Sequence, residues 1–116
     1  MAKPVLYLMV GYPGAGKTTI ARLICETTGA VHLWADLERH TMFENPTHSA
    51  EESRQLYDHL NHVTSDLLAA GKSVVFDTNF NYRRDRDHMR QIASANSAQV
   101  VIIWLTTPKE LARQRA

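Results

Sequence analysis

The sequence predicts an α/β domain built on an open parallel sheet with helices on both faces. Short apolar runs alternate with longer segments in which apolar residues recur at helical spacing. The apolar runs are nearly continuous, which is typical of strands buried on both faces of a parallel sheet. We expect four strands within these 116 residues and five in a complete domain.

The first strand is predicted at residues 5–10, VLYLMV, and a glycine-rich turn follows it. Ile20, Leu23 and Ile24 then keep helical spacing up to Gly29, a residue type that commonly ends helices. A second, short strand is predicted at residues 30–34.

Residues 36–49 are polar and contain the breaker Asn45-Pro46, which predicts a loop with a single helical turn. A long amphipathic helix is predicted at residues 51–70, before Gly71. Its expected inward face is Leu56, Leu60, Val63 and Leu67.

The third strand is predicted at residues 73–77 and the fourth at residues 99–105, with a helix at 81–95 between them. Asn81 is the expected cap of that helix, and Met89, Ile92 and Ala93 are its expected inward residues. Pro108 opens a further helix. Because the chain stops one or two turns into it, we expect residues 1–116 to be a single domain that is truncated or incompletely observed at its C-terminal end.

Composition fits one soluble globular domain, with 44% apolar residues, 22% charged residues and a net charge of +1. This near-neutral balance gives no electrostatic signal for binding duplex nucleic acid. The single cysteine, Cys25, cannot form an internal disulfide, and no apolar run is long enough for a signal peptide or a membrane span. We therefore expect a cytoplasmic protein.

Residues 11–19, GYPGAGKTT, have the chemistry of a phosphate-binding loop. Gly11, Gly14 and Gly16 allow the backbone to approach a polyphosphate closely, and the following helix adds unpaired N–H groups. Lys17 can reach the terminal phosphates, and the Thr18 hydroxyl can ligate Mg²⁺. The spacing is that of a P-loop, or Walker A motif, between a strand and a helix, which predicts a P-loop NTPase fold. The expected nucleotide-binding residues are Gly11, Pro13, Gly14, Ala15, Gly16, Lys17, Thr18 and Thr19. An ordinary glycine-rich turn with a surface lysine is the alternative.

Asp77 ends the third predicted strand, where a Walker B acid would hold Mg²⁺ together with Thr18. A turn or capping aspartate is the alternative. Because no glutamate follows Asp77, an ATPase of the motor type is disfavoured. No Asn-Lys-x-Asp or Thr-Lys-x-Asp motif supports guanine binding, so ATP is favoured over GTP.

Asp36 follows the second strand and should reach the same edge of the sheet, where it could act as a general base. Arg39, three residues later, could hold an acceptor phosphate or the transferring group. The alternative for this pair is a helix cap and a solvated arginine.

The combination of GYPGAGKTT, WADLER and VVFDTNFNYRRDR resembles the small P-loop kinases of the polynucleotide kinase and zeta-toxin-like type. The resemblance implies that Asp36 is the general base and that Arg39 contacts the phosphates or the acceptor. It also places Asn79 near the acceptor and makes Arg115 the match to an arginine on the lid side. Arg83 is a further candidate for contact with an anionic acceptor, although a solvated surface is the alternative.

We therefore expect an ATP- and Mg²⁺-dependent kinase that transfers the γ-phosphate to a hydroxyl group, with Asp36, Lys17, Arg39 and Arg115 as its catalytic residues. The acceptor could be a nucleic-acid 5′ end, a nucleotide sugar or a small metabolite. Two other classes stay open: a nucleotide-binding regulatory module without turnover, and a P-loop NTP hydrolase. No membrane partner is expected.

Overall fold

Four parallel strands form one sheet in the computed structural model, which describes residues 3–11, 16–78 and 83–105. The strands are β1 (Val5–Gly11), β2 (Val31–Trp34), β3 (Val74–Asp77) and β4 (Gln99–Leu105), in the order β2-β3-β1-β4. In the register of the sheet, Trp34 at the end of β2 lies beside Asp77 at the end of β3. This confirms the predicted α/β class with an open parallel sheet.

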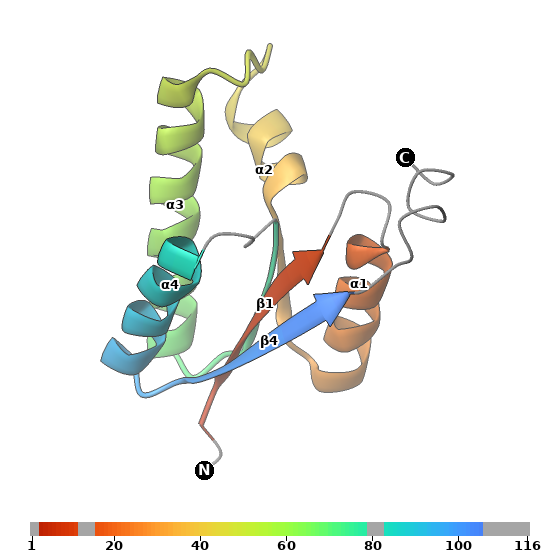
Figure 1. Cartoon of the computed structure of the whole chain (residues 1–116), viewed down its shortest axis with the longest axis vertical. Coiled ribbons are helices and arrows are strands. Elements are labelled where there is room, and N and C mark those ends of the chain that lie inside the picture. The colour runs from red at the N-terminus through yellow and green to blue at the C-terminus, as the bar shows by residue number, and fades with distance from the viewer. Residues whose placement is uncertain (1–2, 12–15, 79–82, 106–116) are drawn as a thin grey trace.

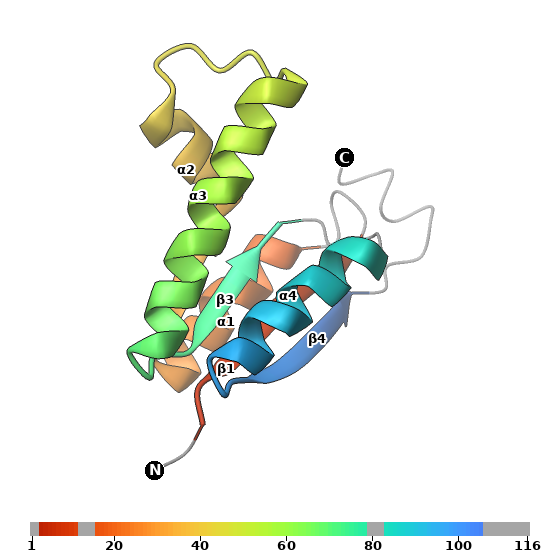
Figure 2. The ribbon, with the colours of Figure 1, turned by 90° about the vertical axis from the view of Figure 1, so that its left-hand side faces the viewer.

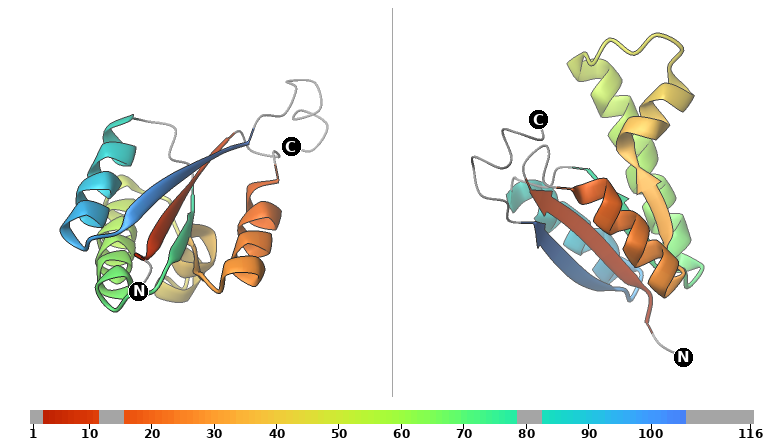
Figure 3. Two further views of the ribbon diagram at one scale, coloured as in Figure 1. Left: turned by 90° about the horizontal axis from the view of Figure 1, so that it is seen from below. Right: turned by 90° about the vertical axis from the view of Figure 1, so that its right-hand side faces the viewer.

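Helices cover both faces of this sheet, as Figure 1 and the left view of Figure 3 show. Helix α1 (Lys17–Thr28) lies on one face, and α3 (Ala50–Ala69) and α4 (Arg83–Ala95) lie on the other. The chain passes from β1 outward to β2 and later from β3 across β1 to β4, so the direction of winding reverses between β1 and β3. In sheets of this kind, ligands bind at the carboxyl ends of the strands where the winding reverses.

The side chains of β3 alternate between two apolar cores. Val74 and Phe76 are fully buried against the α3 and α4 side, whereas Val75 is buried with Ala21 on the α1 side. Continuing this alternation, Asp77 faces the α1 side and Thr78 faces the α3 and α4 side. The side chains of Asp77 and Thr78, at the end of β3 and just after it, therefore lie on opposite faces of the sheet.

Helix α3 begins at a Ser49 cap, whose hydroxyl accepts a hydrogen bond from the N–H of Glu52 at 3.1 Å. Its N-terminal half extends past the carboxyl edge of the sheet beside α2 (Ala35–Met42), as Figure 2 shows. Its buried residues recur every four positions: Glu52, Leu56, Leu60, Thr64 and Leu68. Thr64 and Leu68 therefore replace the expected Val63 and Leu67 as the most buried residues, and the latter two are partly buried.

Helix α2 is longer than the single helical turn that the sequence predicts. It has eight residues and no side-chain cap at its N-terminus, but Ala35 and Arg39 are buried. The acidic residues Asp36 and Glu38 lie in its first turn and Arg39 and His40 in its last, which suits the helix dipole. The helix forms because packing against the rest of the domain supports a sequence with weak local signals.

The predicted cap at Asn81 and the predicted helix that opens at Pro108 lie outside the described residues. Within residues 3–11, 16–78 and 83–105, no helix is both long and apolar enough to cross a membrane.

Candidate functional site

The start of α1 has the backbone conformation that a phosphate-binding loop needs. Gly16 directly precedes the helix with φ 86° and ψ 25°, a left-handed conformation that L side chains rarely adopt. A β-carbon at this position would meet no atom within 4 Å, so the backbone angle, not crowding, requires glycine. No side chain among the described residues caps the first N–H groups of α1, which suits the binding of an anion there.

Lys17 lies at the reversal of winding between β1 and β3. Its Nζ donates to the carbonyl oxygen of Gly11 at 3.5 Å, so the side chain folds back over the end of β1. Partial burial lowers the pKa of Lys17, while the carboxylates of Asp77 and then Asp36 act in the opposite direction. The ammonium group is therefore within electrostatic reach of both predicted acids.

Asp77 is buried at the end of β3, and among the described residues its side chain forms a hydrogen bond with His32. His32 on the neighbouring strand donates from Nε2 to Oδ2 of Asp77 at 3.0 Å. The His32 ring stacks on Trp34, with centroids 6.0 Å apart and planes 3° from parallel. This stacking fixes the imidazole, which in turn fixes one oxygen of the carboxylate. His32 is a positioning residue that sequence reasoning did not single out.

Asp36 lies in the first turn of α2, and its side chain is exposed. Its charge contributes to the pKa of Lys17, so it faces the same edge of the sheet. A solvent-accessible carboxylate near a partly buried ammonium group suits a group that must accept a proton from a bound substrate.

Arg39 is placed differently from Asp36, because its side chain is buried between α2 and α3. Its Nη1 donates to Oε1 of Glu52 at 2.6 Å, and its Nη2 donates to the hydroxyl of Ser53 at 3.1 Å. Two donors of the guanidinium are thus committed to α3 in this structure. Arg39 therefore joins α2 to α3. The sequence led us to expect that Arg39 contacts the acceptor, whereas in this structure its guanidinium contacts α3.

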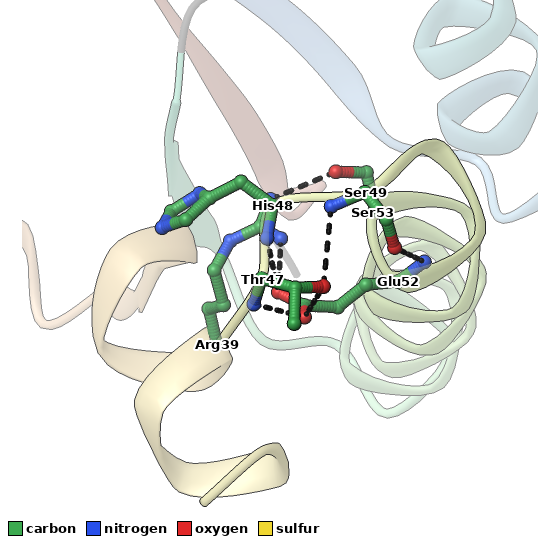
Figure 4. Close-up of polar contacts among 6 residues, drawn as sticks. All are labelled: Arg39, Thr47, His48, Ser49, Glu52 and Ser53. Carbon is green, nitrogen blue, oxygen red and sulfur yellow. Dashed lines mark hydrogen bonds and ion pairs between the residues drawn. The ribbon is translucent and has the colours of Figure 1, made fainter. Parts of the chain in front are cut away.

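Glu52 is the centre of the same network (Figure 4). Its Oε2 accepts from the N–H of Thr47 at 2.6 Å and from the Thr47 hydroxyl at 2.9 Å, and its Oε1 also accepts from the N–H of His48 at 3.3 Å. The Thr47 N–H contributes most to lowering the pKa of Glu52 to about 2, and Arg39 adds to it. Glu52 was not singled out from the sequence. The pattern Ser49-x-x-Glu52, which is typical of a capping box, could have indicated it.

A cavity of about 430 Å³ opens between the N-terminal halves of α3 and α4. The hydroxyls of Tyr57 and Thr78 share a hydrogen bond at 2.7 Å beside it, and Met89 is buried under it. Because Thr78 follows Asp77 directly, the cavity adjoins the same edge of the sheet on the opposite face from α1. Its lining residues are Ala50, Ser53, Arg54, Tyr57, Asp58, Asn61, Thr78, Asp85, His88 and Met89.

Three of the remaining predicted site residues lie within the described part of the chain. Thr18 and Thr19 lie in the first turn of α1, and Arg83 opens α4 with Nε 3.6 Å from Oδ2 of Asp87. The others lie outside the described residues: Pro13, Gly14, Ala15, Asn79 and Arg115.

The oxygen donors at this edge suit Mg²⁺. Asp77 offers a carboxylate at the end of β3, and Thr18 offers a hydroxyl in the first turn of α1. Among the described residues, no three His, Cys, Asp or Glu side chains gather into a metal cage. Mg²⁺ at phosphate-transfer sites is commonly held by one or two protein oxygens together with substrate phosphates and water, so the two donors fit.

Comparison with known proteins agrees with the fold. The family described as AAA domain matches residues 6–116, and no curated protein sequence matches the chain. A candidate kinase from Chloroflexus aurantiacus superposes with a TM-score of 0.81 and 22% identity, over 98% of this chain and 64% of its own.

Two further solved structures are similar. A chain of the Pnkp1/Rnl/Hen1 RNA repair complex has a TM-score of 0.86 and 23% identity, over 99% of this chain and 37% of its own. The APS kinase CysC of Mycobacterium tuberculosis, in complex with AMPPNP and APS, has a TM-score of 0.79 and 19% identity, over 99% of this chain and 69% of its own. The chain thus spans less than two thirds of the first two of these three proteins, and at these identities the likeness shows the fold.

Proposed function

Because the chain belongs to the AAA domain family and has the fold of P-loop kinases, we propose that it is an ATP-dependent phosphotransferase acting on a hydroxyl acceptor. The observation that carries this proposal is the position of Lys17. Its ammonium group lies over the end of β1, within electrostatic reach of Asp77 and Asp36. One cation and two acids at the carboxyl edge of the sheet are the groups that phosphoryl transfer requires.

Each group has a proposed role that follows from its position. The backbone N–H groups of Gly16 and the first turn of α1, together with the Lys17 ammonium, hold the phosphates of the nucleotide, because they present positive charge at one helix N-terminus. Thr18 and Asp77 hold Mg²⁺, and His32 keeps the Asp77 carboxylate in place. ATP with bound Mg²⁺ supplies the phosphoryl group.

Asp36 accepts the proton of the acceptor hydroxyl, since its carboxylate is exposed and is close enough to Lys17 for the two charges to interact. Arg39 acts through α2: its ion pair with Glu52 fixes the helix that carries Asp36. We therefore assign Arg39 a positioning role. Asn79 and Arg115 keep the proposed roles that the resemblance implies.

The proposal is tested by transfer of label from [γ-³²P]ATP to a panel of hydroxyl compounds. We expect Asp36→Asn to lower the transfer rate by roughly 10²–10⁴-fold, the usual contribution of a general base, while ATP affinity stays within twofold. Asp66→Asn, the same change at an exposed position of α3, is the matched control.

Three outcomes would contradict the proposal. Equal transfer by Asp36→Asn and the unaltered protein would remove Asp36 from the base role. ATP cleavage without any acceptor, at a rate equal to the best acceptor-dependent rate, would indicate a hydrolase instead. Binding of ATP with neither cleavage nor transfer would indicate a nucleotide-binding module.

A further inference from the structure

The cavity between α3 and α4 has the position of an acceptor subsite. Thr78 lines it and follows Asp77 directly, so one wall of the cavity begins where the proposed Mg²⁺ site ends. The cavity lies on the α3 and α4 face, whereas α1, whose N-terminus is the proposed phosphate site, lies on the other face. A compound in it would approach the nucleotide from the opposite side of the sheet edge.

The base of the cavity is formed by well-packed residues, and the volume of the cavity suits one small molecule. Met89 is buried, and the hydrogen bond between Tyr57 and Thr78 ties α3 to the end of β3. A volume of about 430 Å³ falls within the range of small-molecule sites and fits a ligand of sugar or nucleoside size.

The charge of the cavity is negative. Asp58 and Asp85 contribute carboxylates, and Arg54 is the one arginine among the described lining residues. Arg54 is already paired, since its Nη2 and Nε donate to Glu51 at 2.6 and 3.2 Å and its Nη1 lies 4.0 Å from Asp58. Glu51 and Asp58 thus place two carboxylates beside this guanidinium, and Asp85 adds a further carboxylate to the lining, which disfavours a phosphorylated ligand and favours a cationic one.

Nearby arginines are also engaged. Arg39 binds Glu52, Arg83 lies beside Asp87, and the guanidinium of Arg86 lies 5.3 Å from the centre of the Trp104 ring. A phosphate entering the cavity would have to compete with these contacts.

We propose that this cavity selects the phosphoryl acceptor, and that the acceptor is a small hydroxyl compound with an ammonium group and no phosphate or carboxylate. The ammonium group faces Asp58 and Asp85, and the hydroxyl that receives phosphate points over Thr78 toward the sheet edge. This inference rests on the proposed phosphotransferase function.

The test measures binding by NMR in the absence of ATP, with glucosamine, glucose and glucosamine 6-phosphate as matched probes, and a wider panel of amino sugars and aminocyclitols beside them. We expect amino compounds to shift the resonances of Tyr57, Asn61 and His88. We expect glucosamine to bind at least about fivefold more tightly than glucosamine 6-phosphate, from one or two exposed charge pairs.

The double variant Asp58→Asn, Asp85→Asn should remove this preference, and Asp58→Lys, Asp85→Lys should reverse it. Asp66→Asn lies on the same helix outside the cavity and should leave the preference unchanged. Circular dichroism checks that each variant is folded.

Tighter binding of glucosamine 6-phosphate to the unaltered protein would overturn the inference, as would shifts confined to other parts of the domain. Failure of the whole amino-compound panel to bind at tens of millimolar would also count against it. If the binding pattern holds but no label moves from ATP to any acceptor, the proposed function fails and the cavity assignment stands. Transfer to phosphorylated acceptors alone would support the proposed function and overturn the cavity assignment.

Discussion

Arg39 on α2 and Glu52 on α3 form a buried ion pair, with Nη1 2.6 Å from Oε1. Both side chains are more than nine-tenths buried, so the remaining charged group would not be solvated by water if its partner were removed. Asp36 lies one turn before Arg39 on the same helix. The ion pair therefore determines how the proposed base is held above the sheet.

Removing the arginine should destabilise the domain and misplace Asp36. Because Arg39→Met leaves the Glu52 carboxylate buried without its cation, we expect the melting temperature to fall by on the order of 10 °C. In the transfer assay we expect kcat to fall with little change in ATP affinity. Arg54→Met removes an exposed pair and should shift the melting temperature by no more than a few degrees. A similar loss of stability in both variants would contradict the special role of Arg39.

Stability should depend on pH through Glu52. The folded protein holds the pKa of this carboxyl at about 2, against an ordinary value of 4.5. The stability that the carboxylate contributes is therefore present above pH 4.5 and is lost as the pH falls toward 2. We expect Glu52→Gln to flatten the fall in melting temperature between pH 5 and pH 2, as followed by circular dichroism. Glu26→Gln, at an exposed position of α1, should retain the full slope.

Gly16 and Gly71 allow the effect on nucleotide binding to be separated from the effect on stability. Both have positive φ, 86° and 80°, and neither has an atom within 4 Å of an added β-carbon. Each change to alanine should therefore cost about 1–2 kcal/mol of stability. We expect only Gly16→Ala to weaken ATP binding, by about tenfold or more in calorimetry, because Gly16 precedes the helix that we propose binds the phosphates. Equal ATP affinity of the two variants would argue against a phosphate site at the start of α1.

Loss of the hydrogen bond from His32 should weaken the use of Mg²⁺. His32→Phe keeps an aromatic ring to stack on Trp34 but frees Oδ2 of Asp77 from its partner. We expect the Mg²⁺ concentration for half-maximal ATP binding to rise about tenfold, as for other residues that orient a metal ligand. ATP binding measured with EDTA should not change. His62→Phe, at an exposed position of α3, is the control, and an unaltered Mg²⁺ requirement in His32→Phe would contradict this role.

The strands and the long helices could be predicted because their signals are local. The continuous apolar runs before Gly11 and Asp77 correspond to β1 and β3, and Gly29 ends α1 as expected. The placement of Asp77 at the carboxyl edge follows from the same pattern. These features depend on residue order alone, and the parallel sheet then brings the strand ends together.

The helix α2 and the burial of Arg39 could not be predicted in the same way. Asp36 and Arg39 are three residues apart, a spacing that suggests one side of a helix, yet one is exposed and the other is buried against Glu52. That outcome depends on the angle at which α3 returns to the sheet, which no local pattern specifies. The cavity at Tyr57 and Asp58 likewise depends on where α4 packs against α3.

Strand β2 ends at Trp34 and α2 begins at the next residue, so no loop residue lies between them. One inserted or deleted residue would rotate the helix by about 100° about its axis and carry the Arg39 guanidinium away from its carboxylate. Variation in loop length between relatives should therefore fall after Met42, in the connection to α3, and leave this junction at a constant length.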